Sequence, residues 1–158
     1  MKNLLSIFTR YSVLNIQNWL FCCFITIACF YKLWLSSVVA FTVPMRYPID
    51  GTWFVRKAKS ISEGHWMGET FDHYTLIKGP AYSMLLSIVS SLGISPKLAI
   101  DSIYILACLV FLKSLSLVIK NRLSLLIGFS LLLFNPITFS EFWTQPIRIN
   151  FYASLVLI

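Results

Sequence analysis

The sequence has 158 residues, of which 58% are hydrophobic and 12% carry a charge. Soluble globular domains have about 25% charged residues, so this composition excludes an ordinary soluble globule and indicates a membrane protein. The formal net charge is +7. The basic residues are scattered and lie mostly at the ends of apolar runs, as is typical of interfacial anchors. Membrane lipid is therefore an expected partner, and nucleic acid is not.

The apolar runs predict an all-α, polytopic transmembrane helical bundle, because they lack the alternating pattern of a transmembrane barrel. The first span is expected at residues 19–43, where Lys32 interrupts the apolar run. A lysine at mid-depth costs about 2.5 to 3.5 kcal/mol on insertion scales. Lys32 is therefore expected to snorkel to the interface, to face other helices or to contact an anionic ligand. The N-terminus resembles a signal peptide, but its apolar part is too long, which indicates a retained anchor.

Residues 44–79 connect the first two spans and contain four of the six acidic residues and both histidines. A short amphipathic helix is predicted from Asp50, because Phe54, Ala58 and Ile61 recur on one helical face. The opposite face carries the polar residues Arg56, Lys59, Ser60 and Glu63. Gly64 is a natural stop. Such a juxtamembrane helix is expected to lie flat in the headgroup layer.

Further spans are predicted at residues 80–94, 98–119 and 123–139, and another apolar run begins at Phe151. Because that run stops at Ile158, the chain is expected to be a single membrane domain, the N-terminal part of a longer protein. Asp101 stands near the start of one span, where a carboxylate is costly in lipid. It is expected to be either a functional residue or a helix-end residue near the headgroups.

Metal-binding patterns are weak. The four cysteines lie in apolar runs without CxxC spacing, which predicts buried free thiols. His65 and His73 stand near Glu69 and Asp72. Their spacing matches no strong zinc motif, so no metal or other cofactor is expected.

The stretch from residue 49 to residue 86 reads IDGTWFVRKAKSISEGHWMGETFDHYTLIKGPAYSMLL, with YKLWL before it and FNPITF and RINFYASL after it. This arrangement resembles the C-type membrane glycosyltransferases, the superfamily of protein O-mannosyltransferases and lipid A aminoarabinose transferases. The resemblance covers essentially the whole chain. The positions that carry it are Asp50, Phe54, Ala58, Gly64, Trp66, Gly68, Thr75, Leu76, Lys78, Gly79, Pro80 and Tyr82.

The resemblance implies inverting transfer of a hexosyl or pentosyl group from a polyprenyl-phosphate donor to a cell-envelope glycan, lipid or protein. It places this activity on the extracytoplasmic face of a bacterial inner membrane, with residues 44–79 outside. The first loop of the family usually carries an acidic pair. Here Gly51 occupies the second position, which weakens any case for a divalent metal.

Transfer to a hydroxyl needs a carboxylate that accepts its proton and a cation that stabilises the departing phosphate. Asp50 and Lys78 are the candidates for these two roles, and Arg56 and His73 are further candidates for substrate binding. Asp50 could instead only cap the amphipathic helix, and Lys78 could be a snorkelling interface lysine.

Two alternatives to an enzyme remain open. One is a small non-catalytic membrane protein, an accessory or assembly subunit. The other is a transporter fragment. Transport sites usually lie at the membrane midplane on broken helices, whereas most ionisable residues here are in a connecting segment.

Overall fold

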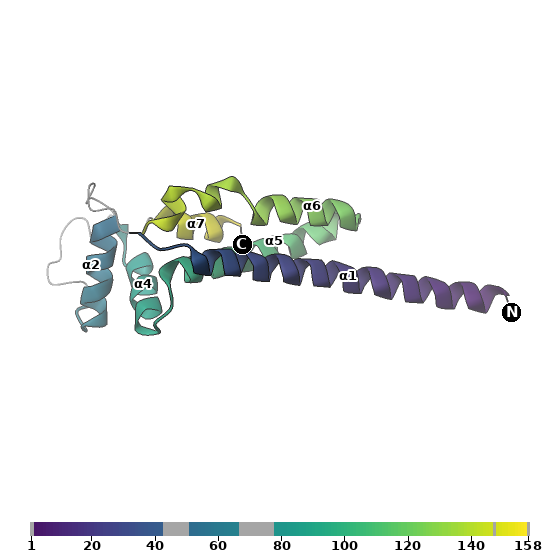
Figure 1. The fold of residues 1–158 in the computed structure, drawn as a ribbon, viewed down its shortest axis with the longest axis horizontal. Helices are drawn as coiled ribbons and strands as arrows, with labels where there is room; N and C mark the ends of the chain where they lie inside the picture. Colours follow the sequence, from purple (N-terminus) through teal and green to yellow (C-terminus); the bar gives the residue numbers. More distant parts are fainter. Residues whose placement is uncertain (1, 43–50, 67–77, 147, 158) are drawn as a thin grey trace.

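The computed structural model describes residues 2–42, 51–66, 78–146 and 148–157. Every element of regular secondary structure in these ranges is a helix (Figure 1). The prediction of an all-α chain is thereby confirmed. Helix α1 is Lys2–Val38, α2 is Gly51–Ser62, α4 is Ala81–Ser91, α5 is Pro96–Val118, α6 is Arg122–Leu133 and α7 is Arg148–Val156. Two short 3₁₀ helices, η1 at Pro136–Phe139 and η2 at Glu141–Thr144, lie between α6 and α7.

Three helical stretches of the described chain are long and apolar enough to cross a bilayer: Gln17–Val38, Pro96–Val118 and Arg122–Phe139. Helices α1, α5 and α6 contact one another and run side by side along the long axis of the molecule (Figure 1). Their shared core contains Ala28, Tyr104, Cys108, Leu125 and Phe129.

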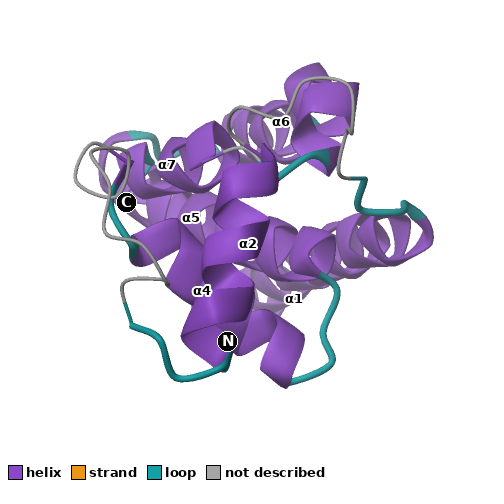
Figure 2. Cartoon of the chain, turned by 90° about the vertical axis from the view of Figure 1, so that its left-hand side faces the viewer, coloured by secondary structure: helices purple, strands orange, loops and turns teal. Residues whose placement is uncertain are grey.

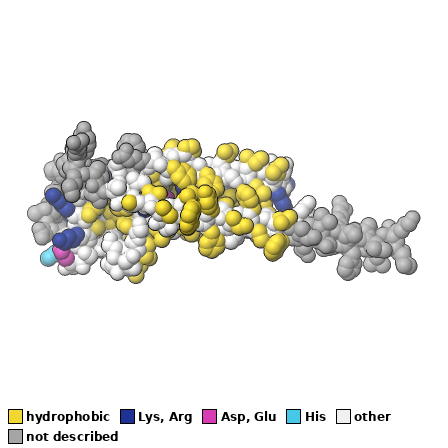
Figure 3. Space-filling model, viewed as in Figure 1, with side chains coloured by type: hydrophobic (Ala, Val, Ile, Leu, Met, Phe, Trp, Pro, Cys, Tyr) yellow, Lys and Arg dark blue, Asp and Glu magenta, His cyan; other side chains and the backbone are white. Residues whose placement is uncertain are grey.

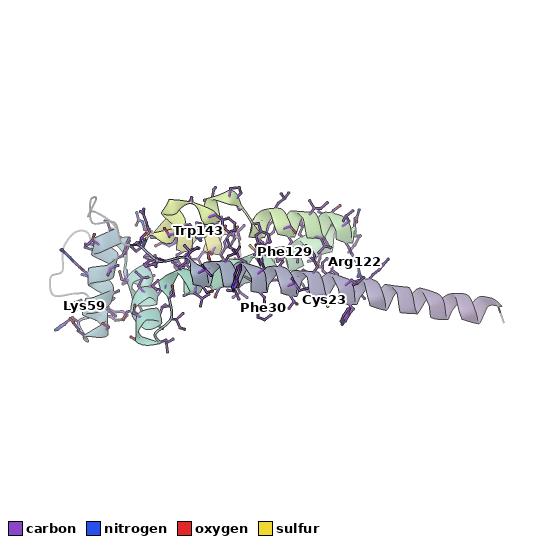
Figure 4. The ribbon with its side chains drawn as sticks, viewed as in Figure 1. Cys23, Phe30, Lys59, Arg122, Phe129 and Trp143 are labelled. Atoms are coloured by element: carbon purple, nitrogen blue, oxygen red, sulfur yellow. The ribbon has the colours of Figure 1, made fainter. Side chains whose placement is uncertain are left out.

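The outer face of this bundle is also apolar. Phe30 points away from the bundle, whereas Phe129 points into it (Figure 4), and their exposed fractions are 68% and 2%. Hydrophobic side chains cover the middle of the described surface, and basic side chains lie toward the two ends of that described part (Figure 3). An apolar belt between charged ends is the surface expected of helices that lie in lipid.

Helices α2 and α4 pack against each other at one end of the bundle and run across the direction of α1 (Figures 1 and 2). Their contact contains Phe54, whose ring meets the Tyr82 ring edge-on at 5.1 Å. The predicted amphipathic pattern of α2 is present, since Phe54 and Ala58 are buried while Arg56 and Lys59 are exposed. The helix ends at Ser62, and the turn that follows contains Gly64, whose φ of 92° suits a glycine.

The segment 80–94 differs from the predicted second span. Helix α4 has 11 residues, which span about 16 Å at 1.5 Å per residue, about half of a 30 Å hydrocarbon core. A turn with Gly93 at φ 68° follows the helix, and Pro96 then starts α5. Helix α4 is thus too short to cross the hydrocarbon core on its own, and it packs on α2 at the end of the bundle. Helix α7 begins at Arg148, three residues before the predicted Phe151, and packs against α5.

Candidate functional site

Of the four predicted site residues, Arg56 and Lys78 belong to the described part of the chain. Asp50 and His73 lie outside the described residues, as do Glu69 and Asp72. Asp50 directly precedes Gly51, the first residue of α2.

Two lysines lie against one tryptophan ring where α2 meets α4. The Nζ atom of Lys78 is 5.5 Å from the centroid of the Trp53 ring, and the Nζ atom of Lys57 is also 5.5 Å from it. Lys78 is in addition 5.9 Å from the Phe54 ring centroid. Only 9% of Lys78 and 8% of Lys57 is exposed. The side chains of Lys57 and Lys78 are therefore largely covered by protein.

Arg56 occupies a different face of α2. It is exposed, like Lys59, whose ammonium lies 3.8 Å from the Glu63 carboxylate in an exposed pair. Such surface pairs contribute little to stability. Arg56 thus faces the surroundings of the helix, whereas its neighbour Lys57 is buried. The signal for Lys57 in the sequence is its spacing, since it follows Trp53 by one helical turn.

Two buried hydroxyl groups begin α4 without a hydrogen-bond partner among the described residues, those of Tyr82 and Ser83. Tyr82 is 1% exposed and Ser83 is fully buried. Burial raises the pKa of the Tyr82 phenol well above its ordinary value, so the phenol stays protonated and can donate a hydrogen bond. Unpaired buried hydroxyls are costly, and these two are available to a polar ligand or to other parts of the chain.

A second polar cluster lies inside the bundle around Asp101, which is fully buried. Its Oδ2 atom accepts hydrogen bonds from Lys97 and Ser36. Its Oδ1 atom accepts one from the indole Nε1 of Trp143 at 2.7 Å. Asp101 is therefore a paired interior residue, in the second turn of α5. Lys97 stands four residues before Asp101, a spacing that brings side chains together on a helix.

Lys32 joins this cluster from α1. Its Nζ atom donates a hydrogen bond to Thr138 Oγ1 at 2.7 Å and lies 3.8 Å from the centroid of the Phe139 ring. Thr138 in turn donates to the Asn135 carbonyl at 2.7 Å. Only 1% of Lys32 is exposed. Lys32 thus faces other helices, which is one of the three alternatives for this lysine.

No group of three or more His, Cys, Asp or Glu side chains in the described ranges is arranged to hold a metal ion. The cysteines Cys22, Cys23, Cys29 and Cys108 are free thiols. Cys108 is buried as expected, whereas Cys22 is exposed on the outer face of α1.

Three apolar helices of membrane-crossing length, between basic ends, are those of an integral membrane protein. No family model matches the chain, and no similar protein is found among curated proteins or solved structures.

Proposed function

We propose that the chain belongs to a polytopic glycosyltransferase in a bacterial inner membrane. It transfers a sugar from a polyprenyl-phosphate donor to a cell-envelope glycan, lipid or protein on the extracytoplasmic face. The observation that carries this proposal is the pair Lys57 and Lys78, which meet at the Trp53 ring at one end of the bundle.

The two ammonium groups suit the departing lipid phosphate. In a sugar transfer the bond between the anomeric carbon and the phosphate oxygen breaks, and the electron pair stays on that oxygen. Cations held in a partly dry site stabilise the developing charge more than they would in water. Lys57 and Lys78 are both nearly buried, and the Tyr82 and Ser83 hydroxyls add uncharged donors nearby in the chain.

Asp50 supplies the base in this proposal. Its carboxylate accepts the proton of the acceptor hydroxyl while the oxygen attacks the anomeric carbon. Asp50 precedes Trp53, the residue whose ring the two lysines contact, by three residues in the sequence. Attack opposite the leaving phosphate inverts the anomeric configuration.

The orientation of α2 supports a site at the membrane surface. The helix lies across the direction of the apolar helices (Figure 1) and exposes Arg56 and Lys59. A basic face of this kind attracts anionic headgroups. We assign α2 to the headgroup layer, where a lipid phosphate and a water-borne hydroxyl can meet.

The test uses the full-length protein in membrane vesicles and a radiolabelled polyprenyl-phosphate sugar. Wild-type vesicles are expected to incorporate sugar into an acceptor, and Asp50→Asn should lower the rate by about 100-fold to 10,000-fold. Lys78→Ala should lower it by about 100-fold to 1,000-fold. The matched control is Lys113→Ala, which removes an exposed lysine from α5 and should leave the rate unchanged.

Each variant is compared at equal protein amount in the membrane. Wild-type vesicles that incorporate no more sugar than vesicles without the protein would favour a non-catalytic subunit. Full activity in both Asp50→Asn and Lys78→Ala would remove these residues from the site.

A further inference from the structure

The cluster inside the bundle contains more positive than negative charge. Among the described side chains of this cluster, Lys32 and Lys97 face one carboxylate, that of Asp101, and all three are at most 3% exposed. Lys32 interacts electrostatically with both other groups. With each group in its usual charge state, the cluster carries one uncompensated positive charge. Such a charge is costly in a low-dielectric interior unless an anion accompanies it.

The hydrogen bonds of the cluster are also incomplete on the lysine side. An ammonium group has three N–H donors. Within the described ranges, Lys32 makes one hydrogen bond, to Thr138, and Lys97 makes one, to Asp101. Asp101 already accepts from Lys97, Ser36 and Trp143, so its oxygens are largely occupied.

A cavity of about 80 Å³ adjoins these groups. Most of its wall is apolar and includes Leu35, Val39 and Phe139, and the side chains of Lys32, Lys97 and Asp101 are also among its lining residues. This volume has room for more than one water molecule or for one small ion. The first turn of α5, which begins at Pro96, adds the partial positive charge of a helix N-terminus.

We propose that this cavity binds one small monovalent inorganic anion of the size of chloride, between Lys32 and Lys97. Water would accept hydrogen bonds from the lysine N–H groups but would leave the excess positive charge in place. A small anion would accept these hydrogen bonds and also neutralise the charge. The ion links α1, α5 and the segment after α6, because these three parts supply Lys32, Lys97 and Thr138. This binding is independent of the proposed sugar transfer.

The test measures thermal unfolding of the full-length protein in detergent, in sodium chloride, sodium bromide or sodium gluconate at equal ionic strength. Chloride and bromide should raise Tm in a saturable way, by about 5 to 10 °C at 100 times the dissociation constant. Gluconate is too large for the cavity and should not raise Tm. Lys32→Met should remove the chloride dependence, and Lys113→Met, on the exposed side of α5, should keep it.

A direct measurement covers the case in which Lys32→Met does not fold. Anomalous scattering from crystals of the wild-type protein grown in bromide should place one ion in the cavity. The proposal is overturned by equal Tm values in chloride and gluconate, by a chloride effect that persists in Lys32→Met, or by an empty cavity in bromide. It is also overturned if Tm follows added anionic phospholipid but not chloride. None of these measurements uses sugar transfer, so either proposal can fail alone.

Discussion

Trp143 donates its indole N–H to the Oδ1 atom of Asp101 at 2.7 Å, although 42 residues separate them in the chain. Trp143 is 4% exposed, and its ring meets the Tyr104 ring edge-on at 5.5 Å. The contact fixes the segment after α6 to α5 by one directional bond and one apolar contact.

Trp143→Phe should destabilise the protein by about 1.5 to 3 kcal/mol, because it removes a hydrogen bond to a buried carboxylate while keeping an aromatic ring. The measurement is unfolding of the detergent-solubilised protein. Trp34→Phe is the matched control, since Trp34 is 58% exposed on α1 and the substitution should have little effect. Equal losses in the two variants would contradict the assigned role of the indole N–H.

Asp101→Asn should destabilise by about 3 to 5 kcal/mol, because it leaves the buried Lys97 ammonium without its negative partner. Glu63→Gln is the control, since Glu63 belongs to an exposed pair and should change stability by less than about 1 kcal/mol. The double variant Lys97→Met with Asp101→Asn should lose less than the sum of the single losses. Additive losses would show that the two groups do not interact.

Phe54→Ala should weaken the packing of α2 on α4 by about 3 to 5 kcal/mol, because it leaves a cavity at a fully buried position. Sugar transfer should fall in parallel, since Lys57 and Lys78 are held by this packing. Val55→Ala changes the neighbouring side chain, which is 36% exposed, and should have a small effect on both measurements. If a destabilised Phe54→Ala protein transferred sugar at the normal rate, the activity would not depend on the packing of α2 on α4.

Gly51→Asp would restore the acidic pair of the resembled family but should destabilise the protein. A Cβ atom at Gly51 would lie 2.9 Å from Cγ of Pro146, and Pro146 is fully buried. Overpacking of this kind costs about 1 to 3 kcal/mol. Combining Gly51→Asp with Pro146→Ala should recover part of the loss in an unfolding measurement. A stable and more active Gly51→Asp protein would contradict this account.

The proposed topology places Lys59 outside the cell and Lys120 inside. In a background without the native cysteines, Lys59→Cys in intact cells should react with a membrane-impermeant maleimide. Lys120→Cys should react only after the membrane is permeabilised. Both positions are exposed, so access depends on the side of the membrane. The reverse pattern would overturn the extracytoplasmic site.

The local parts of the fold could be predicted from the sequence. The spacing of Phe54 and Ala58 gives the buried face of α2, and the apolar runs give α1 and α5. The apolar run at residues 80–94 did not predict the length and orientation of α4. The turn at Gly93 ends the apolar segment early, and packing on α2 determines the orientation of α4.

The interior polar cluster was only partly visible in the sequence. Lys32 and Asp101 could be singled out because a charged side chain is costly in lipid. Lys97 could be identified as a partner of Asp101 because the two are four residues apart on a helix. The partner of Lys32 is Thr138, which is 106 residues away. No local pattern connects such distant positions, so this contact emerges only from the three-dimensional fold.

The hydrogen bond between Lys32 and Thr138 also determines the axial register of α1 relative to the neighbouring helices. Leucine and isoleucine contacts on apolar helices are nearly interchangeable, so a shift of one turn, about 5.4 Å, would change them little. The same shift would place Ala28 or Ser36 where Lys32 now stands and would leave its ammonium in hydrocarbon. A single polar contact thereby selects one alignment of α1 among several that bury similar apolar surface.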